Sequence, residues 1–239
     1  CNKGGDWLQY LQEQHLDFPT ALQILAAEAG VELSAGAEKA WQASQRRAGV
    51  LEVAQELFVQ ELKQASTPQA QAVASYLQER GYTQAEIQDM ELGAYTLGRD
   101  DLQRRLKGRG YTEQEIKASG LLTRGFGDTH RLTLLWTDPA GRAIGLVGRP
   151  ALAQLPAGQA KYMYSAGLEK DQGLIGLSRV RGSSQLLLVE GVLDALYLNA
   201  NGIKTVAVGG TSLSAEQLKA MEQAGAKELL LALDSDSAG

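Results

Sequence analysis

The sequence predicts a mixed α+β protein whose N-terminal part is helical and whose last part is a Rossmann-like α/β unit. Two continuous apolar runs, Leu186–Val189 and Leu229–Leu233, have the composition of parallel strands that are buried on both faces. A shorter β-branched run, Thr205–Val208, lies between them. Amphipathic segments separate the runs, and Ser214 with Gln217 forms a capping box at the start of the second segment. The order is βαβαβ, which is right-handed by default and brings the three strand ends to one edge.

Length and composition exclude several classes of protein. The 239 residues are enough for one large domain or two small ones, and 44% apolar with 21% charged residues is typical of a globular chain. No run of about 18 apolar residues is present, which excludes a transmembrane helix. The single cysteine excludes an internal disulfide, and no signal peptide is visible. We therefore expect a reducing, cytoplasmic location and no membrane partner.

Charge is unevenly distributed along the chain. The net charge of −5 argues against a uniformly basic nucleic-acid coat. However, residues 101–149 hold nine Arg or Lys against five Asp or Glu, and residues 186–239 hold three Lys against seven Asp or Glu. A basic segment beside an acidic, metal-binding one is what phosphoryl transfer on a polynucleotide needs. Ordinary scatter of surface charge explains the difference equally well.

Helices dominate the first half of the chain. A short amphipathic helix is expected over residues 7–11, and a second over Ala21–Ala29. Residues 34–66 are rich in Ala, Gln and Glu and contain no Pro, so they predict one long helix or two in series that connect two domains. The next helix begins at Thr67 and has Pro68 at its first helical position.

A short internal repeat follows this helix. The pattern R-G-Y-T-x-x-E-I occurs at 80–87 and again at 109–116. In each copy the threonine is the N-cap residue, and the glutamate three positions later completes a capping box. Two copies do not make a solenoid, so we expect paired helix–turn–helix elements that pack on one another.

The period changes to two after residue 121. Leu132–Trp136 and Ala143–Val147 predict two strands joined by a turn at residues 138–141. Residues 150–160 form a loop rich in Pro, Ala and Gly.

Four carboxylates are predicted to meet at the carboxyl edge of the parallel strands. Glu190 directly follows the first strand, and Asp194 lies near the first turn of the next helix. Asp234 and Asp236 follow the third strand, and their spacing puts both side chains on one face of an extended segment. Such carboxylates repel one another unless cations lie among them, and Mg²⁺ or Mn²⁺ prefer oxygen ligands. Acidic strand ends also occur in doubly wound phosphatases and receiver domains.

Three motifs at this edge resemble the Toprim domain: E-G-x-x-D at 190–194, G-G-T-S at 209–212 and D-x-D-x-A-G at 234–239. This domain is shared by bacterial DnaG-type primases, type IA and type II topoisomerases and some nucleases. The glycine-threonine turn and the final A-G are most similar to the primase version.

The fold class is therefore α+β with an α/β Toprim unit. The resemblance to the Toprim domain implies that Asp234 and Asp236 are catalytic metal ligands. It makes Glu190 either a ligand or a general base, and Asp194 a weaker or more distant ligand.

The N-terminal half also resembles a DnaG-type primase. C-x-K-G-G-D at the start of the chain, followed by F-P-x-A-x-x-x-L-A at 18–26, resembles the end of the zinc-ribbon module. The resemblance implies that Cys1 is the last Zn²⁺ ligand and that the other three ligands precede residue 1, because structural zinc takes four Cys or His ligands. Y-L-x-x-R-G at 76–81 with L-G-A-Y at 92–95 resembles the helical start of the primase catalytic core.

Three basic residues fall on motif positions of the same family. The segment from Arg131 to Arg149 resembles R-x-x-F-P-I…G-x-x-I-G-F-G-G-R, and Lys161 lies in a segment that resembles P-K-Y-x-N-S. The resemblance implies that Arg131, Arg149 and Lys161 hold nucleotide phosphates or the template.

This chain departs from those patterns at several positions. Leu134-Leu135 replaces Phe-Pro, and Ala160 replaces the proline before the lysine. Tyr164 replaces the asparagine of the second motif. Thr129 and His130 occupy neighbouring arginine positions, so we expect one basic contact to be weakened or lost.

The resemblance covers nearly the whole chain and implies four parts. Residues 1–33 end a zinc-binding module, 34–66 form a helical linker, 67–184 begin the catalytic core, and 185–239 are a truncated Toprim domain. The implied function is DNA primase, a nucleotidyltransferase that makes short RNA primers. Its implied partners are a single-stranded DNA template, ribonucleoside triphosphates and a replicative helicase. Its implied metals are Mg²⁺ or Mn²⁺, with Zn²⁺ in the full-length protein.

Two alternatives stay open. The first is another Toprim chemistry, a metal-dependent nuclease or a topoisomerase-related protein. The second is a non-catalytic nucleic-acid-binding module, whose binding would be insensitive to Glu190→Gln and Asp234→Asn. Because the chain starts with Cys1 and stops just after the aspartate pair, we expect a fragment cut at both ends, with a helix after Gly239 that covers the third strand.

Overall fold

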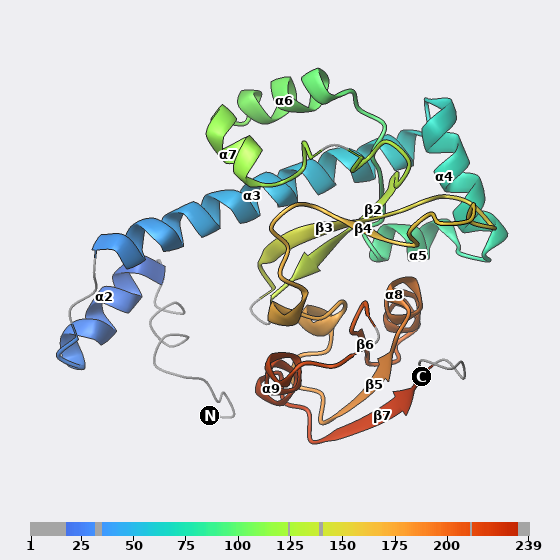
Figure 1. Ribbon diagram of the computed structural model, residues 1–239. Helices are drawn as coiled ribbons and strands as arrows, with labels where there is room; N and C mark the ends of the chain where they lie inside the picture. Colours follow the sequence, from blue (N-terminus) through green and yellow to red (C-terminus); the bar gives the residue numbers. More distant parts are fainter. Residues whose placement is uncertain (1–17, 32–34, 124, 139–140, 211, 234–239) are drawn as a thin grey trace. The chain divides into compact units, whose positions relative to one another are not determined.

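The computed structural model describes residues 18–31, 35–123, 125–138, 141–210 and 212–233 (Figure 1). The chain forms two compact units, Cys1–Arg46 and Arg47–Gly239. The helix expected over residues 7–11 lies outside the described residues. Over the part of the chain that is described, no helix is both long and apolar enough to cross a membrane.

The first unit holds α2 (Phe18–Glu28) and the beginning of α3 (Ala35–Gln64). α2 matches the helix predicted over 21–29 closely and ends at Glu28, two residues before Gly30, whose φ of +66° lies in the left-handed region. Glycine adopts this conformation without a steric penalty, so it is favoured after a helix. α3 is one continuous helix of 30 residues, which decides between the two alternatives for the linker.

A four-stranded antiparallel sheet forms the centre of the second unit, in the order β1-β2-β3-β4. The predicted hairpin is confirmed: β2 (Leu132–Thr137) pairs antiparallel with β3 (Ala143–Arg149). The short strands β1 (Gly93–Ala94) and β4 (Met163–Tyr164) pair with the outer sides of the hairpin.

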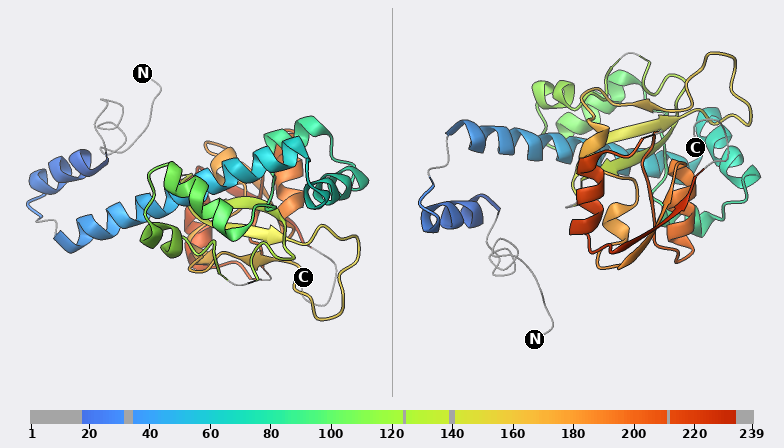
Figure 2. Two further views of the ribbon diagram at one scale, coloured as in Figure 1. Left: turned by 90° about the horizontal axis from the view of Figure 1, so that it is seen from above. Right: turned by 60° about the horizontal axis from the view of Figure 1, so that its bottom comes forward.

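Helices cover both faces of this sheet. Successive residues of β2 point to opposite faces, so they pack against different sets of helices. Leu134 and Trp136 of β2 join a core cluster with α4 (Pro68–Glu79) and α8 (Val192–Ala200). On the other face, Leu135 packs against a second cluster that includes buried residues of α3, α6 and α7. α6 spans Arg99–Gly108 and α7 spans Glu113–Ala118. Figure 1 and the left view of Figure 2 show α6 and α7 beside α3.

The two repeat copies form the same local structure on different sides of the sheet. Both predicted capping boxes are present, at the start of α5 (Gln84–Asp89) and of α7. Ile87 belongs to the cluster with α8, whereas Ile116 belongs to the cluster with α3. The expectation that the copies pack on one another is therefore wrong. A capping box determines where a helix begins, and the apolar neighbours that each helix meets are set by the rest of the chain.

A parallel three-stranded sheet follows, in the order β6-β5-β7. β5 (Gln185–Val189), β6 (Thr205–Ala207) and β7 (Glu228–Ala232) match the three predicted runs closely. α8 and α9 (Ala215–Gln223) connect them, and the predicted capping box of Ser214 with Gln217 is present. The short 3₁₀ segments η1 (Lys170–Gln172) and η2 (Leu177–Arg179) lead into this sheet.

The third parallel strand differs from the sequence prediction. Leu230 and Leu231 of β7 are 45% and 65% exposed, and Leu233 after it is 44% exposed. β7 is an edge strand whose sheet partner is β5. The prediction that this run is buried on both faces is therefore wrong for the described residues. Its apolar composition alone does not distinguish an edge strand from a central one.

Candidate active-site edge of the parallel sheet

The carboxyl ends of the three parallel strands lie side by side. Val189 of β5 pairs with Ala207 of β6 and with Ala232 of β7, so the residues that follow all three strands lie at one edge of the sheet. Glu190 directly follows Val189 and is partly buried. Open parallel sheets place their sites at this edge.

The E-G-x-x-D motif folds into a tight turn between β5 and α8. Gly191 is the N-cap residue of α8, and Asp194 lies in the first turn of that helix. A Cβ atom at residue 191 would overlap the carboxylate of Asp194. Glycine at this position therefore allows the aspartate side chain to lie close to the backbone that follows Glu190.

Asp194 also faces a cation from the helical part of the unit. The guanidinium of Arg80, at the end of α4, lies 3.8 Å from the Asp194 carboxylate, and the side chains of the two residues are 37% and 60% exposed. An exposed pair of this kind adds little to stability. The ion pair matters for the site because it holds the Arg80 guanidinium at the carboxylate edge.

Arg80 belongs to a cluster of arginines and tyrosines. The Tyr76 hydroxyl accepts a hydrogen bond from Arg80 Nη1 at 3.3 Å and one from Arg149 Nε at 2.9 Å. Arg149 Nη1 donates to the Tyr162 hydroxyl at 3.1 Å. The Arg149 guanidinium also lies 5.8 Å and 5.4 Å from the ring centroids of Tyr76 and Tyr162, within the range of a cation–π contact. We call Tyr76, Arg80, Arg149 and Tyr162 the Arg–Tyr cluster.

Arg149 is the buried charge of this cluster, with 9% of its surface exposed, and its neighbour Tyr76 is 5% exposed. Burial raises the pKa of Tyr162, and the neighbouring Arg149 charge opposes that shift, so the phenol stays neutral and serves as a hydrogen-bond acceptor. A charge that is desolvated and held by two hydroxyls keeps a fixed orientation.

The three basic residues predicted from the motifs are not brought together. Lys161 is exposed, and its Nζ atom lies 5.8 Å from the Tyr162 ring centroid, so it neighbours the Arg–Tyr cluster. Arg131 lies elsewhere: its Nη1 atom donates to the backbone oxygen of Tyr95 at 3.0 Å. It lines a separate cavity of about 310 Å³ together with Arg99 and residues 121–123 and 125–128. The roles of all three residues in binding stay predictions.

Sequence reasoning missed two cations near this edge. Arg80 belongs to the Y-L-x-x-R-G motif and to the first repeat copy, and neither pattern predicted a contact with the carboxylates. Lys170, on η1, has its Nζ atom 4.7 Å from the ring centroid of Tyr164. Arg80 and Asp194 are far apart in the chain, so no spacing in the sequence indicates their contact. Lys170 and Tyr164 are joined by an irregular segment, which has no periodicity from which their contact could be predicted.

The donor chemistry of the edge suits a hard divalent cation. All four proposed ligands, Glu190, Asp194, Asp234 and Asp236, are carboxylates, which Mg²⁺ and Mn²⁺ prefer. The structure places the first two at the same edge, and both aspartates of the pair lie outside the described residues. Within the described ranges, no group of three or more His, Cys, Asp or Glu side chains could hold a metal ion.

Cys1, the proposed zinc ligand, also lies outside the described residues. It is the only cysteine of the chain. Structural zinc needs four Cys or His ligands, so this cysteine could supply one of them at most.

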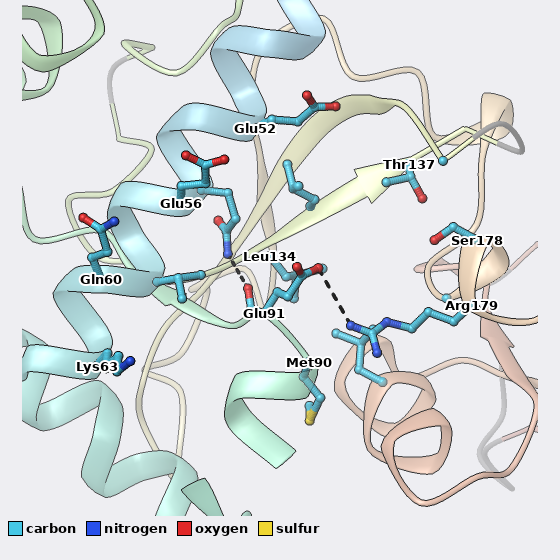
Figure 3. Close-up of a pocket in the computed structure, with 16 residues that line it drawn as sticks. Glu52, Glu56, Gln60, Lys63, Met90, Glu91, Leu134, Thr137, Ser178 and Arg179 are labelled. Carbon is cyan, nitrogen blue, oxygen red and sulfur yellow. Dashed lines mark hydrogen bonds and ion pairs between the residues drawn. The ribbon is translucent and has the colours of Figure 1, made fainter. Parts of the chain in front are cut away.

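A larger cavity of about 630 Å³ lies away from the carboxylate edge (Figure 3). Glu52, Glu56, Gln60 and Lys63 line it along one side of α3, and Ser178 and Arg179 form the opposite wall. In it Gln55 donates to the backbone oxygen of Glu91 at 2.7 Å, and Arg179 lies 3.8 Å from the Glu91 carboxylate. Its lining does not include the carboxylates or the Arg–Tyr cluster, so the candidate active site does not coincide with this cavity.

Comparison with known families agrees with this geometry. Residues 57–176 match the family model for the N-terminal domain of the DNA primase catalytic core, and residues 187–239 match a Toprim-like model. The first match spans half of the chain. The chain belongs to the DnaG-type DNA primase family.

Individual relatives give the same result over the full chain. The chain is 29% identical to a DNA primase of Deinococcus radiodurans over 255 residues, covering all of this chain and 42% of the relative. It is 30% identical to a DNA primase of Enterococcus faecalis over 264 residues, again covering 42% of the relative. The chain thus spans about two fifths of the length of these primases.

Solved structures of primases share this fold. A DNA primase domain from Pseudomonas aeruginosa is 31% identical, with a TM-score of 0.64 over 81% of this chain and 63% of that chain. A DnaG primase catalytic domain bound to single-stranded DNA is 26% identical, with a TM-score of 0.68 over 83% of this chain and 64% of that chain. The zinc-binding and RNA polymerase domains of the Aquifex aeolicus primase match 98% of this chain and 59% of that chain at 23% identity and a TM-score of 0.66, which shows the fold alone.

Proposed function

We propose that the protein synthesises short RNA primers on a single-stranded DNA template, as a DNA-directed nucleotidyltransferase. The observation that supports this most is the contact between Arg80 and Asp194, because it joins the Arg–Tyr cluster to the carboxylate edge. A site that transfers a nucleotidyl group needs cations for the phosphates of its substrate beside carboxylates for divalent metals. The family membership of the chain supports the same activity.

In the proposed reaction, the 3′-hydroxyl of a primer attacks the α-phosphorus of a ribonucleoside triphosphate. A new P–O bond forms, and the bond to the leaving pyrophosphate breaks. Glu190 would accept the hydroxyl proton or ligate metal, and Asp194 would act as a weaker or more distant ligand at the same edge, which is supported by their positions at and after the end of β5. Arg80 and Lys161 would hold phosphates directly, while the buried Arg149 would keep Tyr76 and Tyr162 in place and contribute its fixed charge.

Glu190, Asp194, Asp234 and Asp236 would hold Mg²⁺ or Mn²⁺ in this proposal. Bound there, such ions supply charge neutralisation at the phosphorus centre and lower the pKa of the attacking hydroxyl. Arg131 would contact the template backbone from its separate position beside Tyr95.

Other parts of the assignment rest on family membership. We propose that residues 1–33 end a zinc-binding module in which Cys1 is one ligand, that 34–66 are a linker, that 67–184 and 185–239 form catalytic parts, and that the protein acts in the cytoplasm with a replicative helicase. Chelation of zinc from the full-length protein, followed by a priming assay, tests the first of these.

The test of the main proposal is a priming assay on the full-length protein. Single-stranded DNA is incubated with labelled ribonucleoside triphosphates and Mg²⁺, and the wild type is compared with the double variant Asp234→Asn, Asp236→Asn. Short RNA products that disappear in the double variant are expected. The matched control is Asp100→Asn, an exposed aspartate of α6, which should leave priming unchanged.

Two other outcomes would overturn the proposal. Equal DNA binding by wild type and double variant, with no RNA product from either, would indicate a binding module without catalysis. Metal-dependent cleavage of the template without nucleotides would indicate a Toprim nuclease.

A further inference from the structure

The turn after β6 borders the carboxylate edge. Val189 pairs with Ala207 in a parallel ladder, and a Cβ atom at Gly209 would lie 3.6 Å from Val192 Cγ2, so Gly209 lies beside the start of α8, close to the turn that carries Glu190. Gly209 is buried and has a φ of +61°, a left-handed backbone conformation that residues other than glycine rarely adopt. The position of this turn therefore sets one boundary of the proposed metal site.

Two aromatic residues from the antiparallel sheet hold this turn. Trp136 of β2 is fully buried, and a Cβ atom at Gly209 would lie 2.6 Å from the edge of its ring. Tyr164 of β4 donates a hydrogen bond from its hydroxyl to the backbone oxygen of Gly209 at 3.0 Å. The two rings contact edge to face, with centroids 6.1 Å apart at an interplanar angle of 68°. We call Trp136, Tyr164 and Gly209 the turn clamp.

Tyr164 is the one polar attachment in this clamp. A packed ring restrains the turn only by excluding volume, whereas the hydroxyl defines a direction and a distance to one backbone oxygen. Burial raises the pKa of Tyr164, so the phenol keeps its proton and can donate this bond at neutral pH. Lys170, whose Nζ atom lies 4.7 Å from the ring centroid, adds a cation on the face of the same ring.

We propose that Tyr164 is a positioning residue for the carboxylate edge, which rests on the proposed function of that edge. Its hydrogen bond fixes the turn at Gly209 and Gly210 relative to Glu190, and so it raises the affinity of the edge for a divalent cation. The hydroxyl lies at the far end of the phenol ring, and asparagine, which stands here in the primase motif, has no group that reaches so far. In this chain the sheet-to-turn attachment is made by the residue that departs from the family pattern.

The test uses the full-length protein and the variant Tyr164→Phe, which removes only the hydroxyl and keeps the ring on Trp136. Binding of Mn²⁺ is measured from the electron paramagnetic resonance signal of the free ion. The variant is expected to bind Mn²⁺ about fivefold more weakly, the effect of one lost neutral hydrogen bond. Amide hydrogen exchange of the metal-free protein should become faster in the peptide that spans residues 205–213.

The matched control is Tyr111→Phe, a partly buried tyrosine on the opposite side of the antiparallel sheet. It should leave Mn²⁺ affinity and exchange of that peptide unchanged. Equal Mn²⁺ affinity in wild type and Tyr164→Phe, or equal weakening by Tyr111→Phe, would overturn the inference alone. A wild type that binds no Mn²⁺ would overturn the proposed metal site together with it. A wild type that binds Mn²⁺ and makes no RNA would contradict only the priming activity.

Discussion

The two copies of R-G-Y-T-x-x-E-I have the same local structure and different tertiary roles. In the copy at 80–87, the backbone N–H of Thr83 donates to Glu86 at 2.7 Å, and the Glu86 N–H donates back to the threonine hydroxyl at 3.2 Å. The corresponding distances in the copy at 109–116 are 2.8 Å and 3.2 Å. The glycines before the caps have φ values of +87° and +84°.

The surroundings of the two copies diverge residue by residue. Arg80 lies 3.8 Å from Asp194 at the carboxylate edge, whereas Arg109 lies 3.9 Å from the exposed Glu56 of α3. Tyr82 packs against Tyr197 of α8, with ring centroids 5.3 Å apart. In the other copy, the Tyr111 hydroxyl lies where a side chain at position 49 of α3 would be.

The same local motif therefore packs into two different core clusters of one unit. The first copy joins the helical part to the parallel sheet, and the second joins α6 and α7 to α3. Variants at matched positions separate the part of each effect that is local from the part that depends on the tertiary surroundings.

The largest effect on stability is expected at the isoleucines. Ile87 and Ile116 are 4% and 0% exposed, so Ile87→Ala and Ile116→Ala should each lower the free energy of unfolding by about 2–5 kcal/mol through lost burial and a new cavity. Urea unfolding of the full-length protein measures this. We expect priming by the folded protein to fall only for Ile87→Ala, since only that cluster includes α8; an equal loss of priming in both variants would contradict the division of roles.

A smaller and more selective effect is expected at the arginines. Arg80→Ala should lower the rate of primer synthesis roughly 10- to 100-fold, the effect of losing a hydrogen bond or ion pair to a charged group, and Arg109→Ala should change it less than about twofold. Steady-state priming assays measure both. Arg80→Lys keeps the charge and should recover part of the rate; full activity of Arg80→Ala would show that the contact with Asp194 has no functional role.

The threonine caps should give equal effects of intermediate size. Thr83→Ala and Thr112→Ala each remove the side chain that accepts from the third residue of the helix, which costs about 1 kcal/mol of stability. Thermal or urea unfolding of the two variants tests the equality. If one variant loses several times more than the other, the capping boxes do not act as independent local units.

The smallest effect is expected at Glu86 and depends on pH. Hydrogen bonds from the Thr83 backbone and side chain, and then from Asn201, lower the pKa of Glu86 below its ordinary value. A depressed carboxyl pKa stabilises the folded state at pH above the unfolded value, and this stabilisation is lost as pH falls through the folded pKa. Glu86→Gln should therefore reduce the loss of stability on acidification, as followed by unfolding midpoints at a series of pH values.

Asn201→Leu provides the control for that pH effect. It removes the hydrogen bond that Asn201, the C-cap residue of α8, donates to Glu86 at 2.9 Å, together with the one that it donates to the backbone oxygen of Tyr197. The hydrogen bonds from Thr83 to Glu86 stay in place, so this variant should reduce the acid sensitivity by less than Glu86→Gln does. Acid sensitivity that is identical in the wild type and in Glu86→Gln would contradict the assignment of the shift to this carboxyl.

Sequence alone determined the local elements and the family. Capping boxes at Thr83, Thr112 and Ser214 were predictable because their hydrogen bonds join residues three positions apart. The hairpin and the parallel strands followed from runs of apolar residues, and the Toprim and primase motifs indicated where the carboxylates lie. Glu190 and Asp194 are located at the predicted edge for this reason.

Only the tertiary structure decided which distant residues meet. The Arg80–Asp194 contact, the bond from Tyr164 to Gly209 and the separation of the two repeat copies join residues that lie far apart in the chain. The exposure of β7 likewise depends on its place at the edge of the sheet. Periodicity reports whether a face of an element is apolar, and it carries no information on which other element covers that face.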